Sequence, residues 1–344
     1  MSKNYDALLL VSFGGPEGQD DVIPFLENVL RGKPVPRERM LEVAEHYRHF
    51  GGVSPINQQN RELIECIRAD FSANGIDMPV YFGNRNWHPM LPDTLRQMKE
   101  DGVKCALAFF TSIYSCYSGC RQYRENIMAA QEEVGEGAPE VHKLRMSFNH
   151  PNYVEASASR VKDAVEQIDE AAREDTLVLF TAHSIPMSMA ENSDYEKQLK
   201  ESCRVIMQQV GSQPWELVYQ SRSGPPSQPW LEPDVCDHIQ SLSDSGSKPQ
   251  NIVIMPVGFV SDHMEVMFDL DTEAAELCEE LGINMVRSKT VGTHPAFVSM
   301  VRELIVERTS DAPKLAVGDL PAWHDVCPKD CCKYEPRRPA ARPG

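Results

Sequence analysis

Short runs of consecutive apolar residues alternate with longer amphipathic stretches along the chain. Each run has the length and composition of a buried strand, and the six clearest are Ala7–Phe13, Met78–Gly83, Cys105–Ser112, Thr176–Ala182, Glu216–Gln220 and Asn251–Val257. Apolar residues recur at helical spacing between them, in Pro92–Glu100, Gln122–Val134, Tyr153–Arg173, Asp194–Val210 and His294–Arg308. Apolar strands that alternate with helices predict parallel βαβ units, with helices on both faces of each sheet.

The chain is long enough for two such domains. Its 344 residues exceed one average domain of roughly 150 residues. Six or more strands fit two doubly wound α/β domains better than one barrel. We therefore expect one domain over 1–174 and a second over 175–320, with the boundary near Asp175. The pattern stops after about Leu320, and we expect residues 321–344, rich in Pro, Arg and Cys, to form an appendage outside the core.

The charge of the chain excludes two kinds of main partner. Lys and Arg number 34, and Asp and Glu number 51, so the net charge is −17. Nucleic acid and anionic lipid would be repelled, whereas cations and neutral ligands would not. No stretch approaches the ~20 apolar residues of a membrane-spanning helix. Residues Met1–Asp6 lack signal-peptide features, so we expect a cytoplasmic protein with no integral membrane association.

The ten cysteines are too sparse for a disulfide scaffold in a chain of this length. Seven are scattered and read mostly as small core residues, namely Cys66, Cys105, Cys116, Cys120, Cys203, Cys236 and Cys278. The other three, Cys327, Cys331 and Cys332, lie together near the end and require a separate explanation.

Residues that follow the strands are candidates for a site, because ligands of open α/β sheets bind beyond the carboxyl ends of strands. The paired glycines of Ser12–Glu17 permit close backbone approach, although a plain βα turn explains them equally. His183 follows the fourth apolar run and is held by Ile-Pro. A neutral imidazole there can bind a metal or accept a proton near pH 7; the alternative is a hydrogen-bonded structural histidine.

A row of carboxylates follows the sixth apolar run. Val260 onward reads as a helix with Ser261 or Asp262 as its N-cap. Glu265, Asp269 and Glu273 are spaced i, i+4, i+8, which places them on one helix face. The alternatives are an ordinary solvated acidic face and a conduit that carries a divalent cation or protons toward Glu265. His183 and Glu265, if they share a cleft, would hold a metal loosely or share abstracted protons.

Other polar positions are weaker candidates. Gln220–Pro226, with Trp230, predicts a rigid polar loop beside the cleft. Arg31, Arg48 and Ser54 are basic or polar groups in an acidic chain that could anchor ligand carboxylates. Taken singly, each is equally explained as a surface residue.

Six collinear motifs give the chain a resemblance to the ferrochelatase family over residues 5–310. They are SFGGPE at 12–17, HFGGVSPIN at 49–57, YSGCRQY at 117–123, TAHSIP at 181–186, QSRSGPP at 220–226 and GFVSDHMEVMFDLD at 258–271. The resemblance implies two Rossmann-like domains with parallel sheets and a porphyrin cleft between them. It also implies a lyase of haem biosynthesis that inserts Fe²⁺ into a porphyrin and displaces two pyrrole protons.

The resemblance further implies the residues of the site. His183 and Glu265 match the pair at the metal-insertion face, and Asp269 and Glu273 match the acidic line. Ser54 and Tyr123 match positions that contact the porphyrin, and Arg31 matches a propionate anchor. The remaining partners expected are Fe²⁺, the porphyrin and transient contacts with neighbouring haem-pathway enzymes.

The wording of the motifs is most similar to the branch that metallates coproporphyrin III. Some members of that branch carry a tyrosine that ligates the product iron, and the matching residue here is Phe13, which cannot. The alternatives are a protoporphyrin IX ferrochelatase, a porphyrin carrier without catalysis, and a cobalt or nickel chelatase. Retention of both His183 and Glu265 argues against a carrier, which needs no proton acceptor.

The clustered cysteines are similar to those of family members that hold a [2Fe–2S] cluster. By this resemblance Cys327, Cys331 and Cys332 supply three thiolates, and the fourth is Cys120, with Cys116 as the second choice. Four thiolates are the usual requirement for such a cluster. A zinc site or free thiols are the alternatives.

Overall fold

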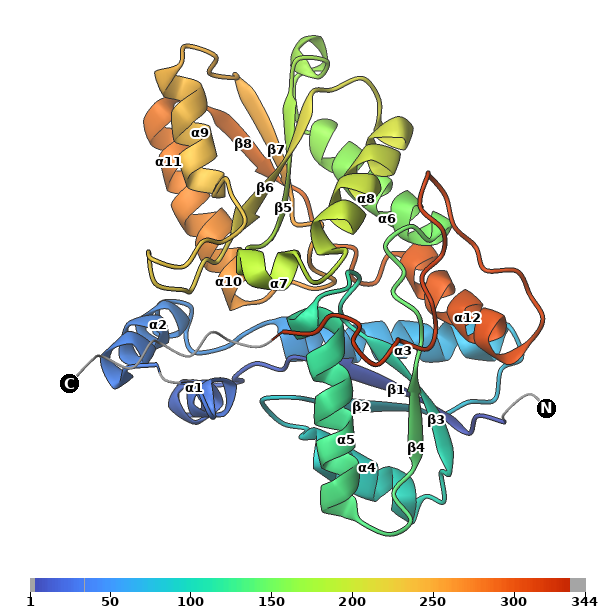
Figure 1. Cartoon of the computed structure of the whole chain (residues 1–344). Helices are drawn as coiled ribbons and strands as arrows, with labels where there is room; N and C mark the ends of the chain where they lie inside the picture. The colour runs from blue at the N-terminus through green and yellow to red at the C-terminus, as the bar shows by residue number, and fades with distance from the viewer. Residues whose placement is uncertain (1–3, 34, 335–344) are drawn as a thin grey trace.

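A computed structural model describes residues 4–33 and 35–334. Its strands form two four-stranded sheets (Figure 1). The first has the order β2-β1-β3-β4 and consists of β1 (Ala7–Ser12), β2 (Val80–Asn84), β3 (Cys105–Phe110) and β4 (Glu140–Lys143). The second has the order β6-β5-β7-β8 and consists of β5 (Leu177–His183), β6 (Trp215–Gln220), β7 (Asn251–Met255) and β8 (Asn284–Arg287). Every strand pair is parallel, which confirms the predicted α/β class.

All six predicted runs contain a strand, and the sequence pattern missed two. The missed strands, β4 and β8, lie at sheet edges and are four residues long. Their sequences, EVHK and NMVR, are mostly exposed or half-buried. These two strands are too short and too polar to form a continuous apolar run, so the sequence pattern gives no signal for them.

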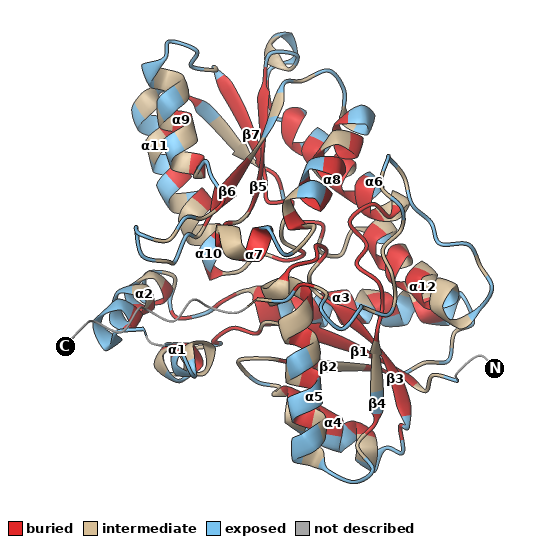
Figure 2. Ribbon diagram, viewed as in Figure 1, coloured by how far each residue is buried: buried red, intermediate tan, exposed pale blue. Residues whose placement is uncertain are grey.

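Helices cover both faces of the first sheet. Leu9 and Val11 of β1 face α4 and α5, whereas Leu8 and Leu10 face α3. This alternation follows from the two-residue period of side chains along a strand. The helices involved are α3 (Ile56–Ala73), α4 (Leu91–Glu100), α5 (Gln122–Val134) and, packed against α3, α12 (Pro295–Thr309). Strands β1 and β3 are buried along their whole length, whereas the edge strands β2 and β4 include half-buried or exposed residues (Figure 2).

The second sheet is covered in the same way. On one face lie α6 (Pro151–Val165) and α8 (Tyr195–Val210), and on the other α9 (Val235–Asp244), α10 (Met264–Phe268) and α11 (Ala275–Leu281). The predicted boundary at Asp175 falls between the sheets. However, α6 precedes it and packs on the second sheet, while α12 packs on α3. One apolar core therefore runs continuously through both sheets.

A helical lobe lies between β1 and α3. It consists of the 3₁₀ turn η1 (Gln19–Asp21), α1 (Val22–Leu30) and α2 (Arg37–His49), with its own small core. The His46 ring stacks on Phe268 of α10, with centroids 3.8 Å apart and planes inclined by 9°. The helical lobe thus connects β1 to α3 of the first sheet and contacts α10, which packs on the second (Figure 1).

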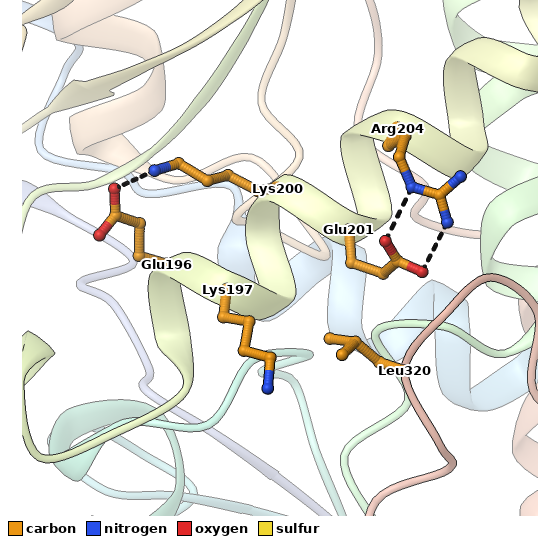
Figure 3. Close-up of a pocket in the computed structure, with 6 residues that line it drawn as sticks. All are labelled: Glu196, Lys197, Lys200, Glu201, Arg204 and Leu320. Atoms are coloured by element: carbon orange, nitrogen blue, oxygen red, sulfur yellow. Dashed lines mark hydrogen bonds and ion pairs between the residues drawn. The ribbon is translucent and has the colours of Figure 1, made fainter.

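The segment between α12 and the predicted tail is docked on the body, and the Lys143 ammonium also donates to the carbonyl of His324 within the tail. The Val317 N–H donates to Asn149 O (2.9 Å), and the Asn149 amide donates to Leu320 O (2.7 Å). Glu201 of α8 accepts the Asp319 N–H and pairs with Arg204 beside Leu320 (Figure 3). Residues 335–344 of the predicted tail lie outside the described part.

Two short helical segments complete the chain, η3 (Glu170–Ala172) and α7 (Met187–Ala190). No helix in the described residues is long and apolar enough to cross a membrane.

A buried ion pair joins α12 to the segment that follows β4. Arg145 and Glu307 expose 1% and 4% of their side chains and form two hydrogen bonds of 2.7 and 3.0 Å. Glu307 also accepts the Leu315 N–H, and Arg145 donates to Leu315 O. Neither charge is solvated, so each depends on the other.

We expect Glu307→Ala to lower the free energy of unfolding by about 3–5 kcal/mol, because it strands the Arg145 charge in the interior. Urea denaturation at neutral pH, followed by circular dichroism, measures this loss. The control is Glu42→Ala, which removes an exposed ion pair with Arg39 and should cost no more than about 1 kcal/mol. Equal losses in the two variants would contradict the assigned role of burial.

Candidate active site

His183 is the last residue of β5, a strand whose preceding residues are all buried. Its Nδ1 faces the carbonyl oxygen of Ser184, which only accepts hydrogen bonds, so Nδ1 carries the proton. The Tyr195 hydroxyl donates to the His183 carbonyl at 3.0 Å and holds the main chain. Nε2 is therefore the ring atom with a lone pair, available to a metal or a proton.

Glu265 faces this lone pair from α10. Its Oε2 lies 3.8 Å from His183 Nε2 and 3.9 Å from His263 Nδ1, and half of its side chain is exposed. The structure thus brings together the predicted pair and adds a second imidazole. Burial lowers the pKa of His263 against the opposing charge of Glu265, which keeps that ring neutral near pH 7.

The segment before Glu265 differs from the prediction. We expected a helix from Val260 capped by Ser261 or Asp262, but the helix begins at Met264 and His263 is its N-cap. The Asp262 carboxylate pairs with Arg287 at 2.9 Å, and the main-chain N–H of Asp262 donates to Gln59 Oε1 at 2.8 Å. These long-range partners hold the segment out of the helix, and they leave no local signal in the sequence.

The acidic line lies along α10 and the π-helical turn η4 (Asp269–Ala274). Asp269 accepts hydrogen bonds from Gln220 Nε2 (3.1 Å) and from the Ser221 hydroxyl. Burial, opposed by the Ser221 bond and assisted by the charge of Glu265, raises the pKa of Asp269 to about 7. Burial also raises the pKa of Glu273. Asp269 is half-buried, whereas Glu265 and Glu273 are exposed, so the line is in part a solvated face. The π turn that carries two of its members is of a kind that often marks functional sites.

Gly14 and Gly15 allow close packing in the turn that follows β1. Gly14 has φ +83°, and a Cβ at Gly15 would lie 2.7 Å from the Ser54 Cβ. The main chain at these glycines therefore approaches other protein atoms closely, which agrees with the interpretation as a plain βα turn. Ser54 is 3% exposed, and its N–H donates to Pro16 O at 2.8 Å.

The other two predicted porphyrin contacts, Arg31 and Tyr123, differ in their exposure to solvent. Arg31 is exposed and donates to Asn28 Oδ1 at 2.6 Å. Tyr123 is buried, and the Arg85 guanidinium lies 4.4 Å from its ring centroid and 5.6 Å from that of Phe13.

Arg85 and Lys33 were not predicted. Arg85 donates to Asn126 Oδ1 (2.6 Å) and to Ser118 O. Burial and then the charge of Arg85 lower the pKa of Lys33, against an opposing effect of Glu265. Single basic residues in loops carry no sequence signal, so only the fold reveals that these cations share one neighbourhood with Glu265.

A second group of potential metal ligands lies on the tail. Cys327 is in hydrogen-bonding contact with both Cys120 and Cys331, and the sulfurs of Cys331 and Cys332 are 3.7 Å apart. The four predicted thiols are therefore contiguous. Cys116 instead accepts the Gly119 N–H at 3.2 Å and caps the π-helical turn η2 (Tyr117–Arg121) that carries Cys120.

Positive groups surround these thiols. Hydrogen bonds from Cys120 and Cys331, followed by the charges of Lys143 and Arg124, lower the pKa of Cys327. Arg121 Nη1 donates to the carbonyl oxygens of Lys329 (3.1 Å) and Cys331 (3.2 Å) and holds the loop. Thiolates are the metal-binding form of cysteine, so four contiguous thiols in this setting fit a four-thiolate centre.

The two parallel sheets place the protein among chelatase-like folds. A solved structure of SirB from Bacillus subtilis with Fe³⁺ aligns with a TM-score of 0.56 over 90% of this chain and 97% of that chain, at 13% identity. DR2241 from Deinococcus radiodurans, described as structurally similar to chelatases, aligns with a TM-score of 0.53 over 89% of this chain and 56% of that chain, at 15% identity. These similarities concern the fold alone.

Sequence comparison then gives the family. The ferrochelatase family profile matches residues 5–309. A ferrochelatase of Rhodopirellula baltica is 65% identical over 99% of this chain and 97% of its own length. Coproporphyrin III ferrochelatases of Streptomyces coelicolor and Frankia alni are both 49% identical, over 98% and 95% of this chain and 96% and 86% of their own lengths. The chain belongs to the ferrochelatase family and is a metal-inserting lyase, as the motifs predicted.

The raised pKa of Asp269 predicts a pH-dependent stability. Between its ordinary pKa of 3.8 and its value of about 7, the folded protein holds a proton that the unfolded chain releases, so stability falls as the pH rises. Asp269→Asn removes this titration. From about pH 5 to about pH 7, the wild type should lose stability relative to Asp269→Asn by at most about 1.4 kcal/mol per pH unit.

Urea denaturation of both proteins across this range measures the difference. Glu279→Gln, an exposed carboxylate on α11, is the control and should follow the wild type. Parallel curves for the wild type and Asp269→Asn would contradict the assigned pKa.

Proposed function

We propose that this protein inserts Fe²⁺ into coproporphyrin III to give its iron complex. The observation that carries the proposal is a set of cations without carboxylate partners. Within residues 4–33 and 35–334, the guanidinium groups of Arg31 and Arg85 bond only to neutral acceptors, although the chain carries a net charge of −17. Coproporphyrin III has four propionates to neutralise them. The names of the actinobacterial relatives support the same substrate.

In this proposal the porphyrin lies in a cleft between domains 1–174 and 175–320. Ser54 and Tyr123 contact the macrocycle, while Arg31 and Arg85 anchor propionates. Phe13 offers no ligand atom, so the iron of the product receives no side-chain ligand from this position.

The insertion chemistry follows from the charges around His183. Metal insertion must remove two pyrrole protons. The lone pair on His183 Nε2 accepts one, and the carboxylate of Glu265, 3.8 Å away, is the acceptor for the other. Fe²⁺ would be delivered along Glu273, Asp269 and Glu265, whose mutual repulsion is relieved by a cation. Few ligands make such a site weak, which suits a metal that must be released.

We also propose that Cys120, Cys327, Cys331 and Cys332 hold a [2Fe–2S] cluster. The contacts among the four thiols and the surrounding Lys143, Arg124 and Arg121 support this. Such a cluster would supply one-electron redox chemistry when bound.

The direct test is anaerobic iron insertion by the purified protein with coproporphyrin III and protoporphyrin IX in parallel. We expect faster turnover of coproporphyrin III. Arg85→Gln should raise the KM for coproporphyrin III about tenfold or more, the value of one charge-assisted hydrogen bond. Arg39→Gln, whose arginine is paired with Glu42, is the matched control. Preference for protoporphyrin IX would overturn the substrate, and inertness toward both would favour a carrier.

Glu265→Gln separates chemistry from binding. The substitution keeps shape and removes charge, so we expect kcat to fall roughly a hundredfold or more with little change in porphyrin affinity measured by fluorescence quenching. His183→Ala should abolish insertion and leave the circular dichroism spectrum unchanged. Glu279→Gln is the control, because it also removes one carboxylate but from an exposed position on α11. Equal losses of turnover and porphyrin affinity in Glu265→Gln would argue against the proposed role.

A further inference from the structure

The tail holds more donors than a four-ligand centre needs. Besides the four proposed cysteines, the imidazole of His324 lies beside Cys331, with Nε2 3.7 Å from Sγ. The ligand atoms of His324, Cys327 and Cys331 all lie within 4.8 Å of one another. A [2Fe–2S] cluster takes four protein ligands, and imidazole is a known replacement for thiolate.

Cys332 is the least favourably placed of the four thiols. It has φ +54°, in the left-handed region that non-glycine residues rarely adopt. The charge of a Cys332 thiolate also acts on the buried Cys116 thiol, outside the proposed centre. Cys332 therefore lies near a thiol outside the proposed centre. The described hydrogen bond of the His324 ring, in contrast, is to Cys331, a member of the centre.

His324 is fixed in place on both sides. Its ring lies against Trp323, with centroids 4.5 Å apart and planes inclined by 31°. The Lys143 ammonium donates to the His324 carbonyl at 3.3 Å, and Lys314 pairs with the neighbouring Asp325 at 2.6 Å. An imidazole held by packing and by its main chain loses little freedom when it binds a metal.

We propose that His324 is a reserve ligand of the tail centre: its imidazole takes the fourth position when the Cys332 thiolate does not bind the metal. The inference rests on the proposed centre and extends it to a three-thiolate, one-imidazole set of Cys120, Cys327, Cys331 and His324. Because neutral imidazole donates less charge than thiolate, this set has a higher reduction potential than four thiolates.

Anaerobic reconstitution of the full chain with iron and sulfide tests the proposal. The proteins are the wild type, Cys332→Ser, His324→Ala and the double variant, with Cys66→Ser and His49→Ala as matched controls and Cys327→Ser as the expected complete loss. Cys332→Ser should retain visible absorption and bound iron, and its reduced form should show nitrogen hyperfine coupling by electron paramagnetic resonance. The double variant should lose most of its iron.

Two results would overturn the role of His324. They are equal iron content in Cys332→Ser and the double variant, and retained iron in Cys332→Ser without nitrogen coupling. If the wild type takes up no cluster, the cluster proposal fails by itself, and a Co²⁺ titration of the metal-free chain then decides about His324. His324→Ala should weaken Co²⁺ binding about tenfold or more; an unchanged affinity would overturn the inference.

Discussion

The carboxyl end of β5 determines the candidate active site. This strand is central in its sheet, paired with β6 on one side and β7 on the other, so its position is set by two ladders of hydrogen bonds and by apolar packing on both faces. His183 is its last residue, and the bond from Nδ1 to the Ser184 carbonyl selects the tautomer. A loop histidine would be free to rotate, whereas this one presents Nε2 to Glu265 in the absence of any ligand.

Around that imidazole the charges are divided between the two halves of the chain. Residues 175–320 contribute the carboxylates of Glu265, Asp269 and Glu273, and burial, with the charge of Glu265 in addition, raises the pKa of Asp269. Residues 1–174 contribute Lys33 and Arg85, whose described hydrogen bonds are to neutral acceptors. In the proposed function a metal cation would offset the first set of charges and an anionic porphyrin the second.

Sequence reasoning found the features that depend on local pattern. Continuous apolar runs predicted the six long strands, and strand ends predicted His183 and Glu265. The strands β4 and β8 were missed because they are only four residues long and carry no continuous apolar run. The helix start at Met264, the packing of α6 on the second sheet and the neighbourhood of Arg85 depend on contacts between distant residues, which no local pattern encodes.

The tail illustrates the same limit and separates two kinds of metal chemistry. Its composition suggested an appendage, and its described residues are attached to the body by the Lys143 bond to the His324 carbonyl and the Arg121 bonds to the carbonyls of Lys329 and Cys331. That docking brings Cys327 to Cys120, more than two hundred positions earlier in the chain. Thiolates bind iron tightly, whereas the carboxylates and the imidazole near β5 bind it weakly. In the proposed function the protein would release iron at one site and retain it at the other, which requires the two donor sets to be held apart, and the fold keeps them on different segments.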